Sequence, residues 1–566
     1  MSIGNGKRTT RPALGQCTIR GFAMRRHLIA YVLVLTAPFL FFHIRGNAQE
    51  SECISRDLAL VNGRIYTMDQ QNSLARSLLI KAGKVAAVDP EEDLFTVCTD
   101  IIDLQQRTVI PGLIDNHVHY IRIANRPGYD NRMLERTFTV QEALETVRRK
   151  VETLSEGELI TTIGGIRRTQ WHEKRFPSRL ELDYVAPRNP VYLSERGSGP
   201  GRTNTAGRNL LRELGVVVTN DGSIAEGVDT AMAYEVLSSD LTNEDRKRQL
   251  LDVSKYALSL GLTTVMDMSG TVPGVGFIDQ TDGYNFFLEL VQENKHKVRT
   301  RMFFPGFDND IELRQLRDHL DKKWPNHGPD MAKVIGIGEW SVSRNLFNQQ
   351  PLGQAAHLAQ RLIAERGWSY HQHLHTAKEI DAHFDIWEEL NREFNLAELR
   401  WTPGHLSHIT PDLIQRAKAM GLGLGVHGQR FHSGAPGGPP WRMVLDSELV
   451  AVGAGSDGAR INTLNPWNMV YYMVTGQDVS GELINDGQQI SRYEAVWLFT
   501  SHQQGWFTKE ENLLGAIGVG RFADIVVLSA DVFDPISVSD EAIRTISSVL
   551  TIVNGEIVYD SGIFPH

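Results

Sequence analysis

The chain has 566 residues, 58 Lys and Arg against 68 Asp and Glu, a net charge of −10, 41% hydrophobic residues and three cysteines. This balance excludes a disordered, collagen-like or disulfide-stapled protein, and the length suffices for one large domain plus a smaller one. A protein with several membrane spans is excluded as well, because only one apolar run approaches spanning length.

That apolar run, LIAYVLVLTAPFLFF at 28–42, follows two arginines and precedes small residues ending at Ala48. The pattern predicts a signal peptide over residues 1–48, cleaved after Ala48, with Met24 as the start that would give a more ordinary signal length. We therefore expect an exported protein, periplasmic or secreted. An uncleaved membrane anchor is the alternative, but the run is shorter than the roughly 20 residues that a span needs.

Removal of residues 1–48 takes away seven basic residues and no acidic one, which changes the net charge from −10 to −17. So acidic a chain is poorly suited to bind nucleic acid, and without the apolar run we expect no stable membrane insertion. The partner we expect is a small-molecule substrate, while the oligomeric state is open. Cys53 and Cys98 can form a disulfide in an oxidising compartment or stay reduced, and the sequence leaves both possibilities open.

Alternating apolar runs with tight Asn-Gly or Ala-Gly turns occur at both ends of the remaining chain, and they predict antiparallel hairpins. The runs are DLALVNGRIYTMD (57–69), SLLIKAGKVAAVD (77–89), GVGRFADIVVLSAD (518–531) and ISSVLTIVNGEIVYDSG (546–562). We expect them to form one β-sandwich, with residues 49–108 as its first part and residues 507–566 as its second.

Between residues 109 and 506, short apolar runs alternate with helical stretches. This alternation predicts an α/β fold, a (β/α)8 TIM-like barrel. The predicted barrel strands are VIPGLIDNHVH (109–119), PVYLSE (190–195), LTTVMDM (262–268), KVIGIGEW (333–340), WSYHQHLH (368–375), LRWTPGH (399–405), GLGLGVHG (421–428) and AVGAGSDG (451–458).

Residue types that bind metal ions stand at the ends of several of these strands. His117 and His119 are two residues apart, so on a strand both imidazoles point to the same side and can share one ion. His373, His405 and Asp457 end the fifth, sixth and eighth runs. Because active sites of such barrels lie at the carboxyl ends of the strands, the five residues predict a divalent-metal site.

Several motifs resemble the metal-dependent amidohydrolases, and within them the YtcJ-like branch (amidohydrolase family 3) that includes N-substituted formamide deformylases. The motifs are VIPGLIDNHVH (109–119), GLTTVMD (261–267), GWSYHQH (367–373), GAGSDG (453–458) and GAIGVGRFADIVVLSAD (515–531). The likeness spans about residues 57–560. It implies a metal-bearing barrel with a composite β-sandwich, and hydrolysis of a non-peptide amide or N-acyl bond by a metal-activated water.

The resemblance implies a role for each residue at the strand ends. Asp457 would take the proton of the water and pass it to the leaving nitrogen. The fourth strand offers Lys333 and Glu339, which share a face, but only Glu339 lies at the carboxyl end. If Glu339 bridges two ions, His117 and His119 hold one of them, His373 and His405 hold the other, and Asp457 lies beside the first; otherwise one ion is bound. Zn²⁺ suits these ligands, although Fe, Mn, Co and Ni fit nearly as well.

Two positions depart from the pattern of the branch. Gly199 stands where the branch often has a histidine, with Asn204 kept, which indicates that one substrate-contacting histidine is absent. Gly404 stands where the branch commonly has Glu before the metal-binding His405, which either opens the pocket or removes a partner of the ligand.

Further candidates have weaker support. Asn204, Arg202 and His427 are candidate substrate contacts, and Arg202 belongs to a group of arginines around the loop 197–201 that can either capture an anion or form a solvated turn. His371 and His375 flank His373 and are open alternatives as partners or ligands. A deaminase or cyclic-amide hydrolase on the same site, or an exported binding protein on a degenerate barrel, are the competing functions.

Overall fold

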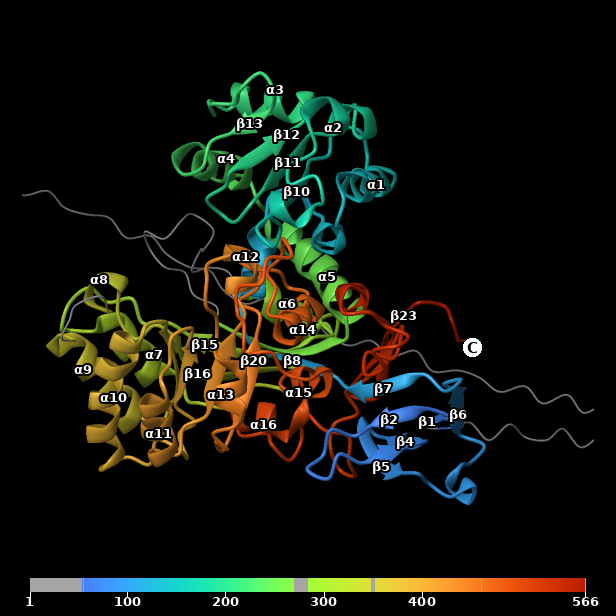
Figure 1. Ribbon diagram of the computed structural model, residues 1–566, viewed down its shortest axis with the longest axis vertical. Coiled ribbons are helices and arrows are strands. Elements are labelled where there is room, and N and C mark those ends of the chain that lie inside the picture. Colours follow the sequence, from blue (N-terminus) through green and yellow to red (C-terminus); the bar gives the residue numbers. More distant parts are fainter. Residues whose placement is uncertain (1–52, 54, 269–283, 348–351, 460, 565–566) are drawn as a thin grey trace, which may run out of the picture. The chain divides into compact units, whose positions relative to one another are not determined.

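The computed structural model describes residue 53 and residues 55–268, 284–347, 352–459 and 461–564 (Figure 1). The predicted signal peptide, residues 1–48, lies outside the described residues. Within these ranges no helix is both long and apolar enough to cross a membrane. The two described cysteines, Cys53 and Cys98, are both disulfide-bonded.

Eight parallel strands form the central sheet, in the order β20-β19-β18-β17-β16-β15-β14-β8. A bridge between Val118 and Gly458 brings the two end strands together, so the sheet is nearly closed into a barrel, which confirms the predicted fold class. The strands are β8 (Leu113–Val118), β14 (Leu262–Asp267), β15 (Arg299–Phe304), β16 (Ala332–Glu339), β17 (Ser369–Leu374), β18 (Thr402–His405), β19 (Leu424–His427) and β20 (Val452–Gly455).

One predicted barrel strand is wrong. The run 190–195 contains β11 (Val191–Ser194), which pairs with strands of a separate sheet. Its place in the barrel is taken by β15, whose sequence RTRMFF has two arginines and lacks the apolar pattern expected of a buried strand. Both arginines are fully buried in ion pairs with residues from the C-terminal part of the chain, Arg299 with Asp524 and Arg301 with Glu510.

The first predicted strand, 109–119, divides between two sheets. Its start is β7 (Thr108–Pro111), which pairs antiparallel with β21 (Ile525–Leu528), and its remainder is β8. Gly112 separates the two, and a Cβ atom there would overlap the side chain of Thr263. The close approach of the two chains therefore requires glycine at this corner.

The helices that follow the barrel strands pack against the sheet, and Figure 1 shows α7, α9, α10 and α11 grouped along one flank. The start of α10 illustrates how the sequence specifies them: the Thr376 side chain accepts a hydrogen bond from the Glu379 N–H, and the Glu379 carboxylate accepts one from the Thr376 N–H. The helices are α5 (Asn243–Ser259), α6 (Asn285–Gln292), α7 (Arg314–Lys322), α8 (Arg344–Phe347), α9 (Gln354–Glu365), α10 (Ala377–Asn391), α11 (Pro411–Ala419), α12 (Arg430–Ser433), α13 (Trp441–Leu445), α14 (Pro466–Thr475), α15 (Arg492–Trp497) and α16 (Ser501–Trp506).

An insertion between β8 and β14 forms its own five-stranded sheet, in the order β13-β12-β11-β10-β9 (green in Figure 1). Its strands are β9 (Tyr129–Asp130), β10 (Ile160–Ile163), β11, β12 (Gly201–Thr203) and β13 (Ser223–Ile224). Its helices are α1 (Val140–Val151), α2 (Arg179–Val185), α3 (Thr205–Glu213) and α4 (Val228–Ser238). The predicted barrel range, 109–506, includes this unit.

Two further sheets are built from the ends of the chain, the first from N-terminal strands alone and the second from strands of both ends. One has the order β5-β4-β1-β6 and the other β23-β22-β21-β7-β2-β3. Leu60, Ile65, Ile525 and Ile552 are fully buried in a hydrophobic cluster that both sheets share. The remaining strands are β1 (Asp57–Val61), β2 (Arg64–Tyr66), β3 (Leu74–Ala75), β4 (Leu78–Lys81), β5 (Lys84–Val88), β6 (Thr99–Asp103), β22 (Ser548–Val553) and β23 (Glu556–Asp560).

Candidate metal centre

The six predicted ligands converge at the carboxyl end of the barrel. Glu339 ends β16 and His405 ends β18, whereas His373 lies in β17 one residue before its end. His117 lies in β8, while His119 and Asp457 follow the ends of β8 and β20. The strand periodicity that puts side chains i and i+2 on one face explains why both histidines of the first pair point to the same place.

The Glu339 carboxylate lies between two pairs of histidines. Its Oε2 atom is 2.6 Å from His373 Nδ1 and 3.3 Å from His405 Nε2. The same atom is 3.4 Å from His117 Nε2, and Oε1 is 3.7 Å from His119 Nε2. One carboxylate thus reaches four imidazoles from three other strands or strand ends.

Asp457 lies beside the first histidine pair. Its Oδ1 atom is 3.2 Å from His119 Nε2 and 3.7 Å from His117 Nε2. Its backbone N–H donates to the His117 carbonyl over 2.8 Å, which fixes the end of β20 against β8. The neighbouring carboxylate of Asp115 accepts hydrogen bonds from the N–H groups of Ser456 and His117 and so joins the same two strands.

Burial and charge set the protonation states of these groups. Burial alone would raise the pKa of Glu339, but the charge of His373 and hydrogen bonds from the surrounding histidines outweigh it and hold the pKa well below its usual value. The pKa of Asp457 is lowered as well, because a hydrogen bond from His119 and nearby imidazoles outweigh burial. Burial lowers the pKa of His117 to about 4. Two carboxylates and at least one neutral imidazole are therefore available at neutral pH.

The residues fit a divalent metal ion. His405 Nδ1 is buried and has no hydrogen-bond partner, and the buried His117 Nε2 faces the carboxylates of Glu339 and Asp457 at 3.4 and 3.7 Å. His117, His119 and Glu339 offer three ligand atoms that lie within 4.8 Å of one another. Imidazole nitrogens and carboxylate oxygens in this number suit Zn²⁺ and its transition-metal neighbours. A second trio, His373, His375 and His405, meets the same distance criterion.

Lys333, the alternative to Glu339 on the fourth strand, lies near the opposite end of β16. Its Nζ atom is 2.9 Å from Glu510 Oε1, and Glu510 also pairs with the buried Arg301. The structure therefore brings Glu339 to the histidine cluster and engages Lys333 elsewhere. The same Nζ atom is also 3.5 Å from Asp330 Oδ1.

Of the predicted substrate contacts, Asn204 and Arg202 lie in the insertion, whereas the ring of His427 packs against His117 and His405. Asn204 is fully buried at the start of α3, where its side chain accepts from the N–H groups of Val191 and Gly207 and donates to two carbonyls. Arg202 on β12 bonds to Asp221 in the same insertion. His427 is fully buried and accepts the His405 N–H over 2.9 Å, so it lines the barrel interior.

Both departures from the pattern of the branch have a steric explanation. A Cβ atom at Gly199 would overlap the side chain of Thr230, and its φ of +85° disfavours any L side chain. A Cβ atom at Gly404 would lie 2.3 Å from His371 Nε2. Gly404 therefore does not open the pocket, because the imidazole of His371 takes the space.

Other contacts around the ligands were not specified by the sequence. The Met268 carbonyl is 2.9 Å from His119 Nδ1 and holds that ring. The Trp340 indole stacks on His373 with the ring centroids 4.7 Å apart. The contact from the Met268 carbonyl cannot be predicted from residue type, because every residue has a backbone carbonyl. The contact from Trp340 could be predicted only from its position directly after Glu339.

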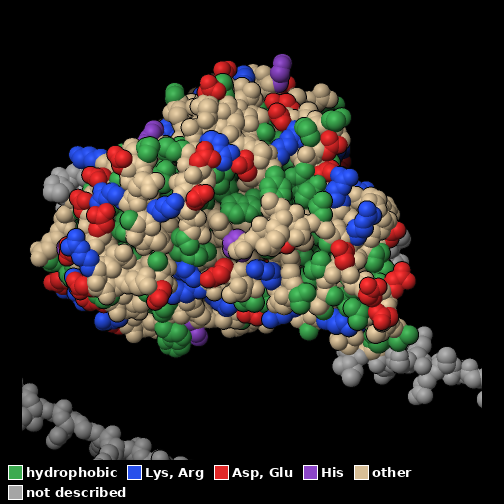
Figure 2. All heavy atoms as spheres, turned by 60° about the horizontal axis from the view of Figure 1, so that its bottom comes forward, with side chains coloured by type: hydrophobic (Ala, Val, Ile, Leu, Met, Phe, Trp, Pro, Cys, Tyr) green, Lys and Arg blue, Asp and Glu red, His purple; other side chains and the backbone are tan. Residues whose placement is uncertain are grey.

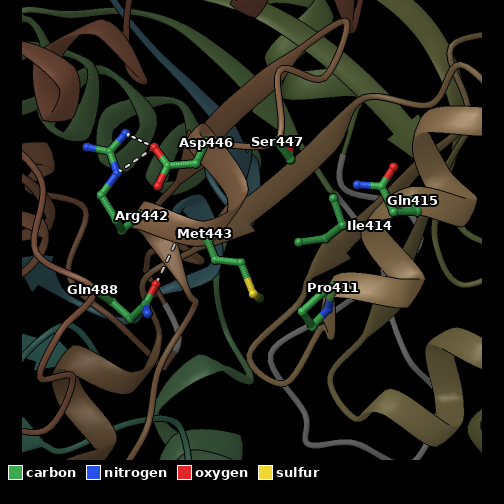
Figure 3. Close-up of a pocket in the computed structure, with 8 residues that line it drawn as sticks. All are labelled: Pro411, Ile414, Gln415, Arg442, Met443, Asp446, Ser447 and Gln488. Atoms are coloured by element: carbon green, nitrogen blue, oxygen red, sulfur yellow. Dashed lines mark hydrogen bonds and ion pairs between the residues drawn. The ribbon is translucent and has the colours of Figure 1, made fainter.

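A separate hollow of about 450 Å³ lies between α11 and α13, and none of the metal-ligand candidates lines it (Figure 3). On the face shown in Figure 2, acidic and basic side chains are interspersed.

The model of the amidohydrolase family (Amidohydro_3) matches residues 100–559. The chain is 24% identical to the N-substituted formamide deformylase of Arthrobacter pascens over 89% of this chain and 98% of that protein. It is also 24% identical to Protein LONG AFTER FAR-RED 3 of Arabidopsis thaliana over 89% of this chain and 92% of that protein.

Solved structures share the fold. A metal-dependent hydrolase from Pyrococcus furiosus matches with a TM-score of 0.56 and 19% identity, over 84% of this chain and 100% of that one. The zinc complex of atrazine chlorohydrolase from Arthrobacter aurescens TC1 matches with a TM-score of 0.52 and 16% identity, over 89% of this chain and 95% of that one. With a family model covering most of its length and a histidine–carboxylate cluster at the carboxyl end of its barrel, the chain belongs to the amidohydrolase family of metal-dependent hydrolases that act on carbon–nitrogen bonds.

Proposed function

We propose that this protein hydrolyses the carbon–nitrogen bond of a small, non-peptide amide, with an N-formyl or other N-acyl amine as the substrate class and two divalent ions, most suitably Zn²⁺, as cofactors. The observation that carries the proposal is the place of Glu339, whose carboxylate lies within 3.7 Å of nitrogens from four histidines. The similarity to a formamide deformylase along nearly its whole length supports the N-formyl class.

The ligand groups divide into two sets around Glu339. His117 and His119 would hold one ion with Asp457 beside them, and His373 and His405 would hold the other. A bound divalent ion lowers the pKa of a coordinated water and polarises a carbonyl oxygen. The protein supplies the geometry, since every one of these side chains is buried or nearly so on a rigid strand end.

Asp457 has the properties of the proton-transferring residue. Its carboxylate is 4% exposed and its pKa is lowered, so it is ionised at neutral pH and can accept the proton of the attacking water. Once protonated, it can donate the same proton to the leaving nitrogen, which departs as an amine. The backbone bond from Asp457 to His117 keeps the carboxylate beside the first ligand pair during both transfers.

The test is amide hydrolysis by the purified chain with measured metal content. An N-benzylformamide and the matching acetamide serve as probes, and amine release is followed. Asp457→Asn should keep the fold and lower turnover by about 10²–10⁴-fold, the range of a general acid–base residue. Asp446→Asn, an exposed aspartate outside the cluster, is the control. Unchanged turnover in Asp457→Asn would remove the proposed role.

We also propose that the chain is exported. The basic residues, apolar run and small residues ahead of Gln49 support a cleaved signal, and disulfide-bonded cysteines are typical of oxidising compartments. N-terminal sequencing of the protein recovered outside the cytoplasm should give a start near Gln49. A chain that still begins at Met1 or Met24 would contradict cleavage.

A further inference from the structure

A hydrogen bond between two histidines crosses the interior of the barrel. His371 Nε2 on β17 lies 3.1 Å from His117 Nδ1 on β8, and both side chains are at most 2% exposed. In the eight-strand order β17 and β8 are four positions apart, so these strands are on opposite sides of the ring. The contact therefore joins a ligand of the first pair to the wall that faces it.

Two glycines make room for the crossing imidazole. Gly404 on β18 and Gly425 on β19 are register partners in adjacent strands. A Cβ atom at Gly404 would lie 2.3 Å from His371 Nε2, and one at Gly425 would lie 3.1 Å from His371 Cε1. The His371 ring also lies nearly parallel to that of His427, with an interplanar angle of 13°. Any side chain at position 404 would displace His371 from His117.

The bond decides which nitrogen of His117 faces the ligand cluster. With Nδ1 engaged by His371, Nε2 is turned to Glu339 at 3.4 Å and Asp457 at 3.7 Å. A neutral imidazole that offers its Nε2 lone pair to a cation carries its proton on Nδ1, and His371 Nε2 accepts that proton in a hydrogen bond. The other histidine of this pair, His119, is oriented by a backbone group instead, because its Nδ1 lies 2.9 Å from the Met268 carbonyl.

We propose that His371 is a positioning residue that orients His117 toward the metal ion, and that Gly404 together with Gly425 forms the recess that this imidazole requires. The inference rests on the proposed metal centre and adds to it a residue that does not itself bind the ion. Removing the acceptor leaves His117 free to rotate and leaves its buried Nδ1–H without a partner, so the ion that His117 shares with His119 is held less tightly.

The test compares two replacements of His371 that have similar size. His371→Gln keeps an amide that can accept from His117 Nδ1, whereas His371→Met fills the recess with a thioether, which is only a weak acceptor. Metal content per folded chain is measured by plasma mass spectrometry, and Zn²⁺ affinity by competition with a chromophoric chelator. We expect His371→Met to weaken one ion by about 10–100-fold, and His371→Gln to recover most of the affinity. His383→Met, at another buried histidine on α10, is the matched control and should leave both ions in place.

The recess is tested separately. Gly404→Ala should weaken the same ion, because the new methyl group displaces His371. The double change Gly404→Ala with His371→Ala removes the overlap, so it should recover thermal stability but not metal affinity. Wild-type affinity for both ions in His371→Met, or in Gly404→Ala, would overturn the inference.

The outcome is distinguishable from failure of the proposed function. If the wild-type chain binds two ions and hydrolyses neither amide probe, the substrate proposal fails, while the role of His371 is still decided by the affinities. If the wild-type chain binds no ion, both proposals fall.

Discussion

Replacement of Glu339 by Gln is the most informative single perturbation of the metal centre. The glutamine has nearly the same shape but loses the charge that four histidine nitrogens surround at 2.6–3.7 Å. A hydrogen bond to a charged group contributes about 1.5–3 kcal/mol, and Glu339 is shared by both ligand pairs. Loss of about 3 kcal/mol on one side corresponds to roughly 100-fold in Kd.

The assay is metal content and Zn²⁺ affinity of Glu339→Gln beside wild type, with Lys333→Gln as the control on the same strand. We expect about two ions in wild type, one or fewer in Glu339→Gln, and two in Lys333→Gln, because Lys333 pairs with Glu510 away from the cluster. Two ions bound with unchanged affinity in Glu339→Gln would refute the bridging role. One ion in all three proteins would establish a mononuclear site.

Two further predictions concern buried carboxylates outside the centre. Glu510→Gln leaves the fully buried Arg301 without its charged partner and should lower the free energy of unfolding by about 3–5 kcal/mol in denaturant titrations; a change below about 1 kcal/mol would contradict this. Burial raises the pKa of Glu135 to about 7 despite its pairing with Arg132. Because the unfolded chain loses this proton near pH 4.5 and the folded chain near 7, stability should fall across that interval, by up to about 3 kcal/mol. Thermal unfolding of Glu135→Gln between pH 4 and 8 should show a flatter profile than wild type, and an equal slope would reject the assignment.

The sequence predicts the barrel well where its strands have apolar runs and fails at the one strand, β15, that has charged residues instead. Seven of the eight predicted runs contain a barrel strand. The eighth strand, β15, escapes prediction because Arg299 and Arg301 make it look polar, although distant acidic residues neutralise both. Conversely, β11 has the apolar run of a barrel strand because it is buried in another partly parallel sheet, and residue pattern alone cannot tell which sheet a strand joins.

The same limit applies to the metal centre. Spacing and strand ends indicate His117, His119, His373, His405 and Asp457, and the structure brings these residues together with Glu339. Glu339 and Lys333 are an even number of residues apart, so a strand puts them on one face. Only the direction of the strand shows that Glu339 is the one at the carboxyl end. The pairing of His371 with the glycine at position 404 depends on contacts between strands, which a single sequence does not reveal.

The insertion also acts on the centre, through the segment that follows Asp457. The Ala459 carbonyl accepts from Arg126, and the Leu464 N–H donates to Glu135. Both partners come from the start of the insertion, more than 300 residues earlier in the chain. Asp457, the proposed proton-transferring residue, therefore lies two residues before a backbone carbonyl that the insertion holds. His119 and His373 instead contact Met268 and Trp340, each directly after a barrel strand. If Asp457 has the proposed role, we expect changes in the insertion to lower turnover before they lower metal binding.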